Sequence, residues 1–578
     1  MAEALPPAAG PAAPPVGPIS GNDAAPPARD LLRYAFALVA GTAVLTWAIS
    51  LAATATSHGA TGAAWDVARN EITVALSDEP PQLDSTRATD QYSFMVLGHV
   101  MEGLVSYDAR NRLTPGVAER WTIRPDGATF HLRANARWSD GKPVTAHDFV
   151  FAWRTMLDPK TASEYAFIAF GIENAEAVNK GEKPVTALGV TAVDDRTLEV
   201  RFARPIAFFD KLMAFSVFYP IREDFHRAQQ GRYGADAHTL LYNGPFRIDT
   251  WIHGAQLRMV RNPSYWNPAR PKLDAVNIGY ITSDTGTWVN LFRDGKIAHA
   301  SLDSENIATA LAQRWHIERE ITGSVYFIEF NHRPGRLTDN VHLRRALQLV
   351  FDPDEFVNKV VKIPGNLPAR SLFPSWIQAP GGPFVQAYPP PWHARVDVEA
   401  ARRELEIARR ELGLEKFPPL VLLNSDSSIA NKQAEYLQRL WKETLGLDIR
   451  IDTQIFKQRL AKMTAGQFDL VAAGWGPDYD DPLTFGDLFA SWNMNNRGRY
   501  RNDALDAQVR IAERSLDPAE RFAAFAEIQR IQYEDATIIP NYEQGKVYVQ
   551  DPHVQGIVRR AVGPSPDYTN ARIVPVLQ

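Results

Sequence analysis

Four aspartates, Asp478, Asp480, Asp481 and Asp487, stand in or just after the stretch Ala473-Gly-Trp-Gly-Pro-Asp-Tyr-Asp-Asp-Pro482. Carboxylates spaced this closely have three interpretations: a solvated loop, a calcium-binding loop, or a carboxylate that binds an ammonium group at the wall of a cleft. The spacing argues against calcium, because a proline and a leucine occupy positions where an EF-hand loop needs a ligand and a glycine. On these residues alone, the solvated loop and the ammonium-binding carboxylate both stay open.

The motifs of common catalytic sites are missing from the sequence. It contains no H-E-x-x-H, G-x-S-x-G, G-x-x-x-x-G-K-[ST] or G-x-G-x-x-G pattern. The 13 histidines are scattered, and there is no cysteine, which excludes a thiolate nucleophile, a thiolate metal site, disulfides and a lipid-modified cysteine. We therefore do not expect an enzyme, and we expect no catalytic residue, no metal and no cofactor.

The elements before the aspartates are predicted to form a parallel sheet covered by helices. Strand and helix patterns alternate, and glycines follow two of the helices, as they do at helix ends. The predicted elements are helices over Val396 to Leu412, Ser428 to Leu445 and Phe456 to Thr464, and strands over Leu420 to Asn424, Leu447 to Thr453 and Phe468 to Gly474. Ligands bind beyond the carboxyl ends of the strands in such sheets. Asp478, four residues past the last strand, is therefore placed to face a ligand.

The first half of the chain mixes strands and helices without an internal repeat. Thr145 gives a capping-box-like start to a helix that places Phe149 and Trp153 on one face. The other predicted elements are strands over Ile72 to Leu76 and Thr129 to Arg133, a helix over Tyr92 to Leu104 and a hairpin over Val190 to Phe202.

Length and composition indicate a globular protein of several lobes. The chain has 578 residues, and a single hydrophobic core rarely grows past about 250 to 300 residues. Hydrophobic residues make up 45%, with 14 Trp, 18 Tyr and 28 Phe, which is enough apolar material for cores and a large cavity. The net charge is −5 and no basic run is interleaved with aromatic residues, so we exclude nucleic acid as a partner.

The N-terminal segment is predicted to direct the chain out of the cytoplasm. Residues 1–33 form a Pro/Ala-rich tail that is expected to be disordered, and residues 34–55 are apolar enough to approach the length of a membrane span. This span is either an uncleaved signal anchor or a secretory signal cleaved after Ala53-Thr54-Ala55. Both alternatives place the remainder in the periplasm or cell envelope, and the lack of cysteine means that the chain is not a lipoprotein.

Several motifs resemble those of one family in an ordered series from about residue 70 to the C-terminus. The sequence is similar to the peptide-binding proteins of ABC importers, solute-binding family 5 (peptide/nickel-binding), and most of all to the periplasmic oligopeptide-binding proteins. The motifs that carry the resemblance are Pro115-Gly-Val-Ala-Glu-Arg-Trp121, Trp138-Ser-Asp-Gly-Lys-Pro-Val-Thr-Ala-His-Asp-Phe-Val150, Asp158-Pro-Lys-Thr-Ala-Ser163, Asn243-Gly-Pro-Phe246, Asn262-Pro-Ser-Tyr-Trp266, Val341-His-Leu-Arg-Arg-Ala346 and the stretch that contains Asp478.

The resemblance implies an α/β, periplasmic-binding-protein-like fold of type II (cluster C). It has two hinged lobes and an extra accessory domain that close over an extended peptide. The implied boundaries are 66–101, 226–327 and 546–578 for lobe I, 102–225 for accessory domain II, and 328–545 for lobe III.

The resemblance also implies how a short peptide is captured, largely independently of its side chains. Asp478 corresponds to the aspartate that binds the peptide's α-ammonium group. The loop and strand around Gly474 and Trp475 bind the ligand main chain as an added strand would, and side chains lie in wet pockets. Three further aromatic residues are expected in the cleft: Tyr165, Tyr542 and Phe456.

The sequence departs from the oligopeptide receptors around the later part of the ligand. Those receptors carry a histidine, a tryptophan and two arginines where this chain has Ala430, Phe456, Met463 and Ala472. The expected cations for a peptide carboxylate are therefore absent, which opens the alternatives of a modified ligand, such as a cell-wall peptide, and of a nickel chelate. Three cations nearby in sequence are candidates to substitute for them, although each is expected more often to be a solvated helix residue: Lys432, Lys457 and Arg459.

The expected partners are a short peptide and the permease subunits of an ABC importer. The protein is expected to be a monomer, and to contact the membrane through its N-terminal segment if that segment is not cleaved. A membrane-anchored peptide sensor is an alternative that rests on the same segment. A peptidase or cell-wall hydrolase would need a nucleophile or metal site that the sequence does not show.

Overall fold

The computed structural model describes residues 62–392 and 395–575 of the chain. The predicted tail over 1–33 and the apolar span over 34–55 lie outside these residues. Within the described residues, no helix combines the length and the apolar character that crossing a membrane requires.

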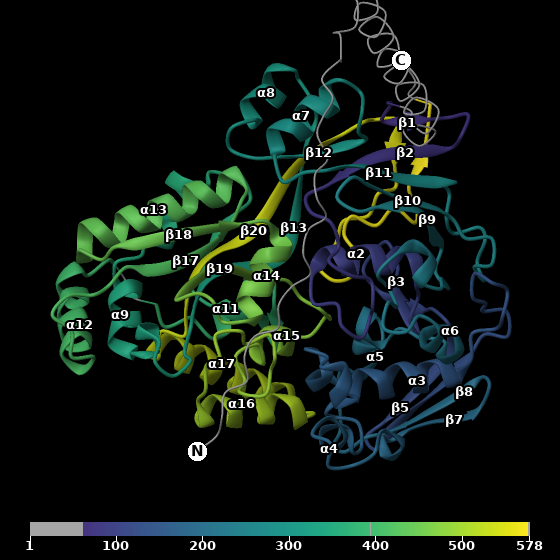
Figure 1. Ribbon diagram of the computed structural model, residues 1–578, viewed down its shortest axis with the longest axis horizontal. Helices are drawn as coiled ribbons and strands as arrows, with labels where there is room; N and C mark the ends of the chain where they lie inside the picture. The colour runs from purple at the N-terminus through teal and green to yellow at the C-terminus, as the bar shows by residue number, and fades with distance from the viewer. Residues whose placement is uncertain (1–61, 393–394, 576–578) are drawn as a thin grey trace, which may run out of the picture. The chain divides into compact units, whose positions relative to one another are not determined.

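A five-stranded sheet joins the start of the described chain to a later segment (Figure 1). Its order is β1-β2-β11-β10-β9, with β2 parallel to β11 and the other neighbours antiparallel. The strands are β1 (Trp65–Asp66), β2 (Glu71–Leu76), β9 (Phe246–Ile252), β10 (Gln256–Arg261) and β11 (Ala275–Ile281). All of β2 is buried, which confirms the strand predicted over Ile72 to Leu76.

The largest sheet is mixed rather than parallel. Its main path is β12-β20-β13-β19-β17-β18, and β14 (Leu367–Pro368) pairs with β20. The strands are β12 (His299–Leu302), β13 (Ile317–Phe330), β17 (Leu420–Ser425), β18 (Ile449–Gln454), β19 (Leu470–Trp475) and β20 (Ile538–Gln550). β17 runs parallel to β18 and β19 as predicted, but β13 runs antiparallel to β19 and β20. The prediction of a parallel sheet is therefore right for three strands only.

The helices beside this sheet begin and end close to the predicted residues. Ser427 caps α13 by accepting a hydrogen bond from the Ala430 N–H, and Gly446 ends it with a φ of 71°. The main helices of this part are α9 (Val341–Leu349), α12 (Val398–Glu411), α13 (Ser428–Leu445), α14 (Phe456–Thr464), α15 (Leu483–Gly486), α16 (Asp503–Arg514) and α17 (Pro518–Glu534).

Residues within the range predicted for accessory domain II form a separate antiparallel sheet. Its order is β5-β6-β8-β7, and its strands are β5 (Ala118–Arg124), β6 (Gly127–Leu132), β7 (Val190–Asp194) and β8 (Thr197–Arg201). Helix α3 (Ala146–Leu157) begins with the predicted capping box of Thr145 and Asp148. Phe149 and Trp153 are both fully buried, as the helix pattern indicated.

Helix α2 (Gln91–Val100) is shorter than the helix predicted over Tyr92 to Leu104. Met101 is already extended, with φ −129° and ψ 162°. Just beyond it, a Cβ on Gly103 would lie 2.8 Å from the carbonyl oxygen of Met213. Close packing against this distant segment favours an extended chain there, although the apolar pattern continues.

The two long strands β13 and β20 run side by side across the predicted lobe boundaries at 327/328 and 545/546 (Figure 1). Their register shifts between Ile321 and Val325, around Gly323, whose φ of 76° favours glycine. Before the shift β13 pairs only with β20, and after it β13 also pairs with β19. The division into lobes stays a prediction, and this bulge lies where the chain would pass between them.

Candidate ligand-binding site

A cavity of about 1450 Å³, partly open to solvent, lies where distant segments of the described chain meet. Its wall includes residues from α2, β13, β19, α14 and β20 together with the segments 214–219, 476–478 and 560–565. Five of the six predicted site residues line it: Tyr165, Phe456, Gly474, Trp475 and Asp478.

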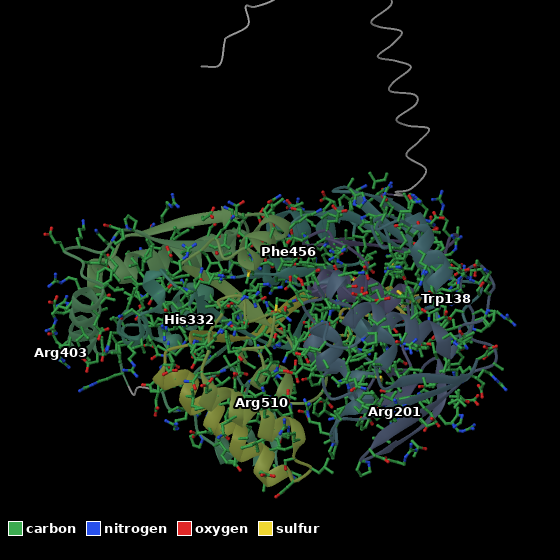
Figure 2. All side chains as sticks on the ribbon, turned by 60° about the horizontal axis from the view of Figure 1, so that its bottom comes forward. Trp138, Arg201, His332, Arg403, Phe456 and Arg510 are labelled. Carbon is green, nitrogen blue, oxygen red and sulfur yellow. The ribbon has the colours of Figure 1, made fainter. Side chains whose placement is uncertain are left out.

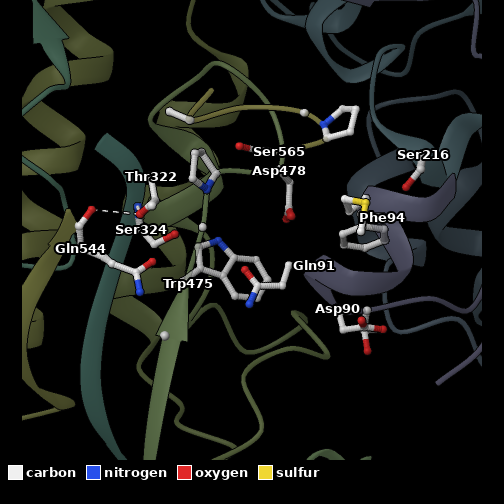
Figure 3. Close-up of a pocket in the computed structure, with 18 of the residues that line it drawn as sticks. Asp90, Gln91, Phe94, Ser216, Thr322, Ser324, Trp475, Asp478, Gln544 and Ser565 are labelled. Atoms are coloured by element: carbon white, nitrogen blue, oxygen red, sulfur yellow. Dashed lines mark hydrogen bonds between the residues drawn. The ribbon is translucent and has the colours of Figure 1, made fainter. Parts of the chain in front are cut away.

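Asp478 presents a carboxyl group to this cavity without a cation beside it. Figure 3 shows the group directed into the space between Trp475 and Phe94. The Tyr165 hydroxyl donates a hydrogen bond to Oδ2 over 2.9 Å. Among the residues that the structure describes, no basic side chain forms an ion pair with Asp478. Burial raises the pKa of Asp478 to about 8, although the Tyr165 hydrogen bond acts in the opposite direction, so the group is largely protonated until a positive charge approaches.

The other three aspartates of the cluster are engaged elsewhere. Asp481 forms a buried ion pair with two nitrogens of Arg521, at 2.6 and 3.0 Å. Asp480 pairs with Lys211 at 3.4 Å. Asp487 is buried, and this burial raises its pKa well above the ordinary range. In the described parts of the chain, no three His, Cys, Asp or Glu side chains are arranged to hold a metal ion.

Thr484 fixes the loop that carries Asp478, a role that no motif indicated. Its Oγ1 accepts a hydrogen bond from the backbone N–H of Asp478 over 3.0 Å. Its carbonyl oxygen accepts one from the indole N–H of Trp475 over 2.7 Å. A lone threonine after a proline carries no recognisable signal in sequence, because its function here depends on the loop folding back onto α15.

Strand β19 has an open backbone edge beside the cavity. β13 pairs with β19 along its whole length from Leu470 to Trp475. On the other side, β17 pairs only with Leu470 and Val471. No strand of the described chain covers that side from Ala472 to Trp475. An extended ligand can add its main chain at such an edge.

Two stacked tyrosine rings lie beside Gly474 of β19: the ring of Tyr326 packs against Gly474, and the ring of Tyr542 packs on Tyr326. Gly474 lies opposite Tyr326 across the strand pair, and a Cβ on Gly474 would come within 3.0 Å of the Tyr326 ring. The Tyr326 ring stacks on Tyr542, with centroids 4.9 Å and planes 3° apart. Tyr326 lines the cavity, whereas Tyr542 is 5% exposed and does not. Tyr326, which the sequence motifs did not indicate, takes the wall position expected for Tyr542.

Phe456, at the start of α14, contacts residues from the other side of the cavity. Its ring meets Tyr92 edge-on at a centroid distance of 4.9 Å, and its backbone N–H donates to Asp78. Figure 2 shows Phe456 between the segments of the first half of the chain and those of the second. Burial, with a smaller effect of Asp426, raises the pKa of Asp78 to about 6. Residues of predicted lobes I and III therefore touch at this point.

Arg459, one turn further along α14, brings a guanidinium without a carboxylate partner to the cavity wall. Its Nη1 donates to the Ala472 carbonyl over 2.9 Å and approaches the Met463 sulfur at 3.6 Å. Its Nε is buried and has no hydrogen-bond partner. Within the described residues it forms no ion pair, although Asp78 influences it electrostatically. Burial lowers the pKa of Arg459, a sign that its charge is poorly solvated.

The expectation that Arg459 is a solvated helix residue is therefore wrong, because the side chain folds over the end of α14 toward β19. It contacts Met463 and Ala472, the two positions at which the resemblance implies arginines. Lys457 and Lys432 are exposed as expected, and Lys432 pairs with Glu305. A guanidinium, that of Arg459, thus lies beside the two positions at which arginines were expected.

Comparison with known proteins assigns the chain to a family. Residues 112–496 match the family described as bacterial extracellular solute-binding proteins, family 5 Middle. The periplasmic oligopeptide-binding protein OppA of Salmonella typhimurium is 32% identical over 470 residues, which cover 79% of this chain and 84% of that protein. The structure of Listeria monocytogenes OppA bound to peptide has a TM-score of 0.82 and 29% identity, covering 88% of this chain and all of that one.

Two further structures differ in how closely they match. The murein tripeptide binding protein MppA of Escherichia coli has a TM-score of 0.80 at 28% identity, covering 88% of this chain and 99% of that one. A structure described as the unliganded open form of MppA has a TM-score of only 0.58 at 26% identity, with 89% and 99% covered. The arrangement of this chain is thus unlike the open form, in agreement with the contacts of Phe456 and Tyr165 across the cavity. The fold is that of the periplasmic binding proteins, and the chain belongs to the bacterial extracellular solute-binding proteins of family 5.

Proposed function

We propose that this protein is the extracytoplasmic substrate-binding component of an ABC importer, and that it captures short peptides whose α-ammonium group binds Asp478. The observation that carries the proposal is a carboxyl group at a cavity wall with one hydroxyl donor and no cation among the described residues. A buried carboxylate of this kind is stabilised by a positive group that arrives with the ligand.

The proposed ion pair between Asp478 and the ligand's ammonium group should contribute a large part of the binding free energy. Removing one partner from a buried ion pair typically costs about 3–5 kcal/mol, because the remaining charge is left unpaired in a poorly solvated place. Lysine side chains and free amines also carry ammonium groups. The open edge of β19, which ends three residues before Asp478, favours a peptide over these, because it offers main-chain hydrogen bonds to an extended chain.

The guanidinium of Arg459 is suited to the other end of the same ligand. It lines the cavity and has no ion-pair partner among the described residues. A peptide carboxylate would pair with it, and arginine forms two parallel hydrogen bonds to such a group. We therefore infer a ligand with an ammonium group near Asp478 and a carboxylate near Arg459.

Closure of two lobes would complete the site. Tyr165 from predicted domain II reaches Asp478 in lobe III, and Arg497 donates to Glu164 over 3.0 Å between the same parts. The bulge around Gly323 in β13 offers a hinge. A ligand favours the closed form when it contacts both lobes only in that form.

The names of the similar proteins support the transport role and the compartment. They include periplasmic oligopeptide-binding proteins and the substrate-binding domain of an oligopeptide ABC transporter. We infer that this chain acts outside the cytoplasm as a binding protein without catalysis, delivers its peptide to permease subunits, and is exported or anchored by its N-terminal segment.

Calorimetry with trialanine and N-acetyl-trialanine tests the proposal. The unmodified peptide should bind the wild-type protein more tightly than the acetylated one by about a hundredfold to a thousandfold, in line with the loss of a buried ion pair. Asp478→Asn should remove most of this difference. Asp480→Asn is the matched control, since its partly exposed pair with Lys211 is expected to contribute about 1 kcal/mol or less. Equal binding of both peptides to the wild-type protein would refute the ammonium site.

A further inference from the structure

A second cavity, of about 740 Å³ and partly open to solvent, adjoins the first. It lies between β2 of the five-stranded sheet, α2, β12, the first part of β13 and the last part of β20. The two cavities share the wall residues Gln91, Met95, Glu320, Lys546 and Ser565. These residues form the boundary between the two cavities, and a ligand side chain would have to pass them to reach the second cavity from the first.

Arg559 places a buried guanidinium in the wall of this second cavity. Its side chain is 9% exposed, and its Cζ lies 3.6 Å from the centre of the Tyr548 ring. Nη1 donates to Gln550 over 2.9 Å, and Nε lies 3.6 Å from Glu320. Nη2 is buried and has no partner within the described structure. A donor left unpaired in a buried cavity is costly, so its presence points to an acceptor that comes with a ligand.

Lys546 adds a second positive charge to the same wall. It lies opposite Glu320 across the β13–β20 pair and is half-buried, yet its ammonium group forms no hydrogen bond or ion pair with the described residues. Glu320 already accepts from the Ser565 hydroxyl over 2.9 Å and faces Arg559. The wall of the cavity thus carries two cations and one carboxylate, and that carboxylate already has Ser565 and Arg559 as partners.

The remaining titratable groups do not cancel this positive charge. His299 is buried, and burial lowers its pKa well below the ordinary range, so it is neutral. Its Nε2 lies 3.0 Å from the Tyr568 hydroxyl. Tyr92, Trp288 and Tyr568 supply aromatic surface against which methylene groups can pack. The cavity is therefore suited to a group with a short apolar stem and an anionic tip.

We propose that the second cavity is a subsite for an acidic side chain of the ligand, whose carboxylate binds Lys546 and Nη2 of Arg559. This inference rests on the proposed peptide-binding function and narrows it, because it assigns the protein a preference for acidic peptides. The carboxylate at the peptide's C-terminus is a second source of the same chemistry, and the experiment must separate the two.

The test uses trialanine in which glutamate or glutamine replaces each residue in turn, with a free or an amidated C-terminus. Calorimetry gives the ratio of affinities within each glutamate–glutamine pair, so that any general effect of a variant cancels. The wild-type protein should prefer glutamate at one position by roughly tenfold or more, as expected for a hydrogen bond to a charged group, with either form of the C-terminus.

Two variants should change the preference for glutamate in opposite directions. Lys546→Gln should reduce the glutamate preference severalfold, and it leaves no protein group unpaired. Glu320→Gln should increase the preference, because the carboxylate that competes for the two cations is gone. Lys457→Gln, on an exposed face, is the matched control and should leave the ratio unchanged.

Three results would overturn the assignment. The first is equal binding of glutamate and glutamine peptides at every position, with tight binding retained. The second is a preference that depends on Lys546 but follows the free C-terminus, which would assign the cavity to the α-carboxylate instead. The third is a failure of all the peptides to bind, which would refute the proposed function together with this inference.

Discussion

Asp478 and Arg459 line the same cavity, one with an acidic and the other with a basic side chain, but they reach it in different ways. Asp478 lies in a loop beyond the carboxyl end of a strand, and its position is fixed by Thr484 and Tyr165. Arg459 projects from a helix and folds back onto Ala472 of the neighbouring strand. The first arrangement depends on a local stretch of sequence, whereas the second depends on how far one long side chain can reach.

This difference bears on how a binding site can change between related proteins. The loop of Asp478 requires several residues together, including the Asp481–Arg521 ion pair that holds it. An arginine on α14 can be moved by one turn and still bring its guanidinium to β19. We therefore expect the proposed ammonium end of the site to tolerate few substitutions, and the proposed carboxylate end to accept an arginine at more than one position.

Replacing Arg459 should produce the largest effect on the carboxylate end. We expect Arg459→Gln to weaken binding of trialanine by roughly tenfold or more, the usual size for a hydrogen bond to a charged group, and to leave binding of trialanine amide nearly unchanged. Titration calorimetry with both peptides measures this. Lys457→Gln on the same helix should change neither affinity. If Arg459→Gln weakens both peptides equally, the guanidinium supports the wall without binding the carboxylate.

Removing the Tyr165 hydroxyl should have a smaller effect on the ammonium end. Tyr165→Phe deletes the donor to Asp478 while it keeps the ring packed against Phe94 and Phe215. We expect affinity for trialanine to fall by about threefold to tenfold, in keeping with one hydrogen bond. The pKa of Asp478 should also rise, because the hydrogen bond lowers it. An unchanged affinity would mean that the hydroxyl does not contribute to the bound state.

The smallest expected effect concerns the stability of the unliganded protein. Burial raises the pKa of Asp478 from its ordinary value of 3.8 to about 8, so the folded state binds the proton more tightly than the unfolded state. The stabilisation is full below about pH 4 and is lost as the pH rises toward about 8. Asp478→Asn should therefore raise the melting temperature by about 1–3 °C at high pH and less at low pH. A lower melting temperature for the variant near pH 8 would show that the ionised carboxylate is already satisfied.

Much of the fold around the site could be predicted from the sequence. The alternating strands and helices from Leu420 to Trp475 have strong period patterns and clear glycine ends, and α13 and α14 have the predicted bounds. The antiparallel strands β13 and β20 could not be predicted in the same way, because their pairing joins segments more than 200 residues apart. Their presence turned the expected parallel sheet into a mixed one.

The candidate site could be predicted only in part, because some of its residues depend on contacts between segments that are distant in the sequence. Asp478, Gly474 and Trp475 belong to one local motif, and all three line the cavity. Arg459, Thr484 and Tyr326 act through contacts that exist only after folding, and neither composition nor spacing distinguishes them from ordinary residues. Whether such a residue lines the cavity depends on how far its side chain extends and on which residues lie opposite it on the neighbouring strand.

Proton release on peptide binding tests the central claim most directly. Near pH 6, a carboxyl group with a pKa of about 8 is protonated in the free protein, and it must ionise to pair with the peptide's ammonium group. Calorimetry of trialanine in two buffers of different ionisation enthalpy gives the number of protons exchanged. We predict the release of about one proton from the wild-type protein and of none from Asp478→Asn. Tight binding by the wild-type protein without proton release would contradict the proposed role of Asp478.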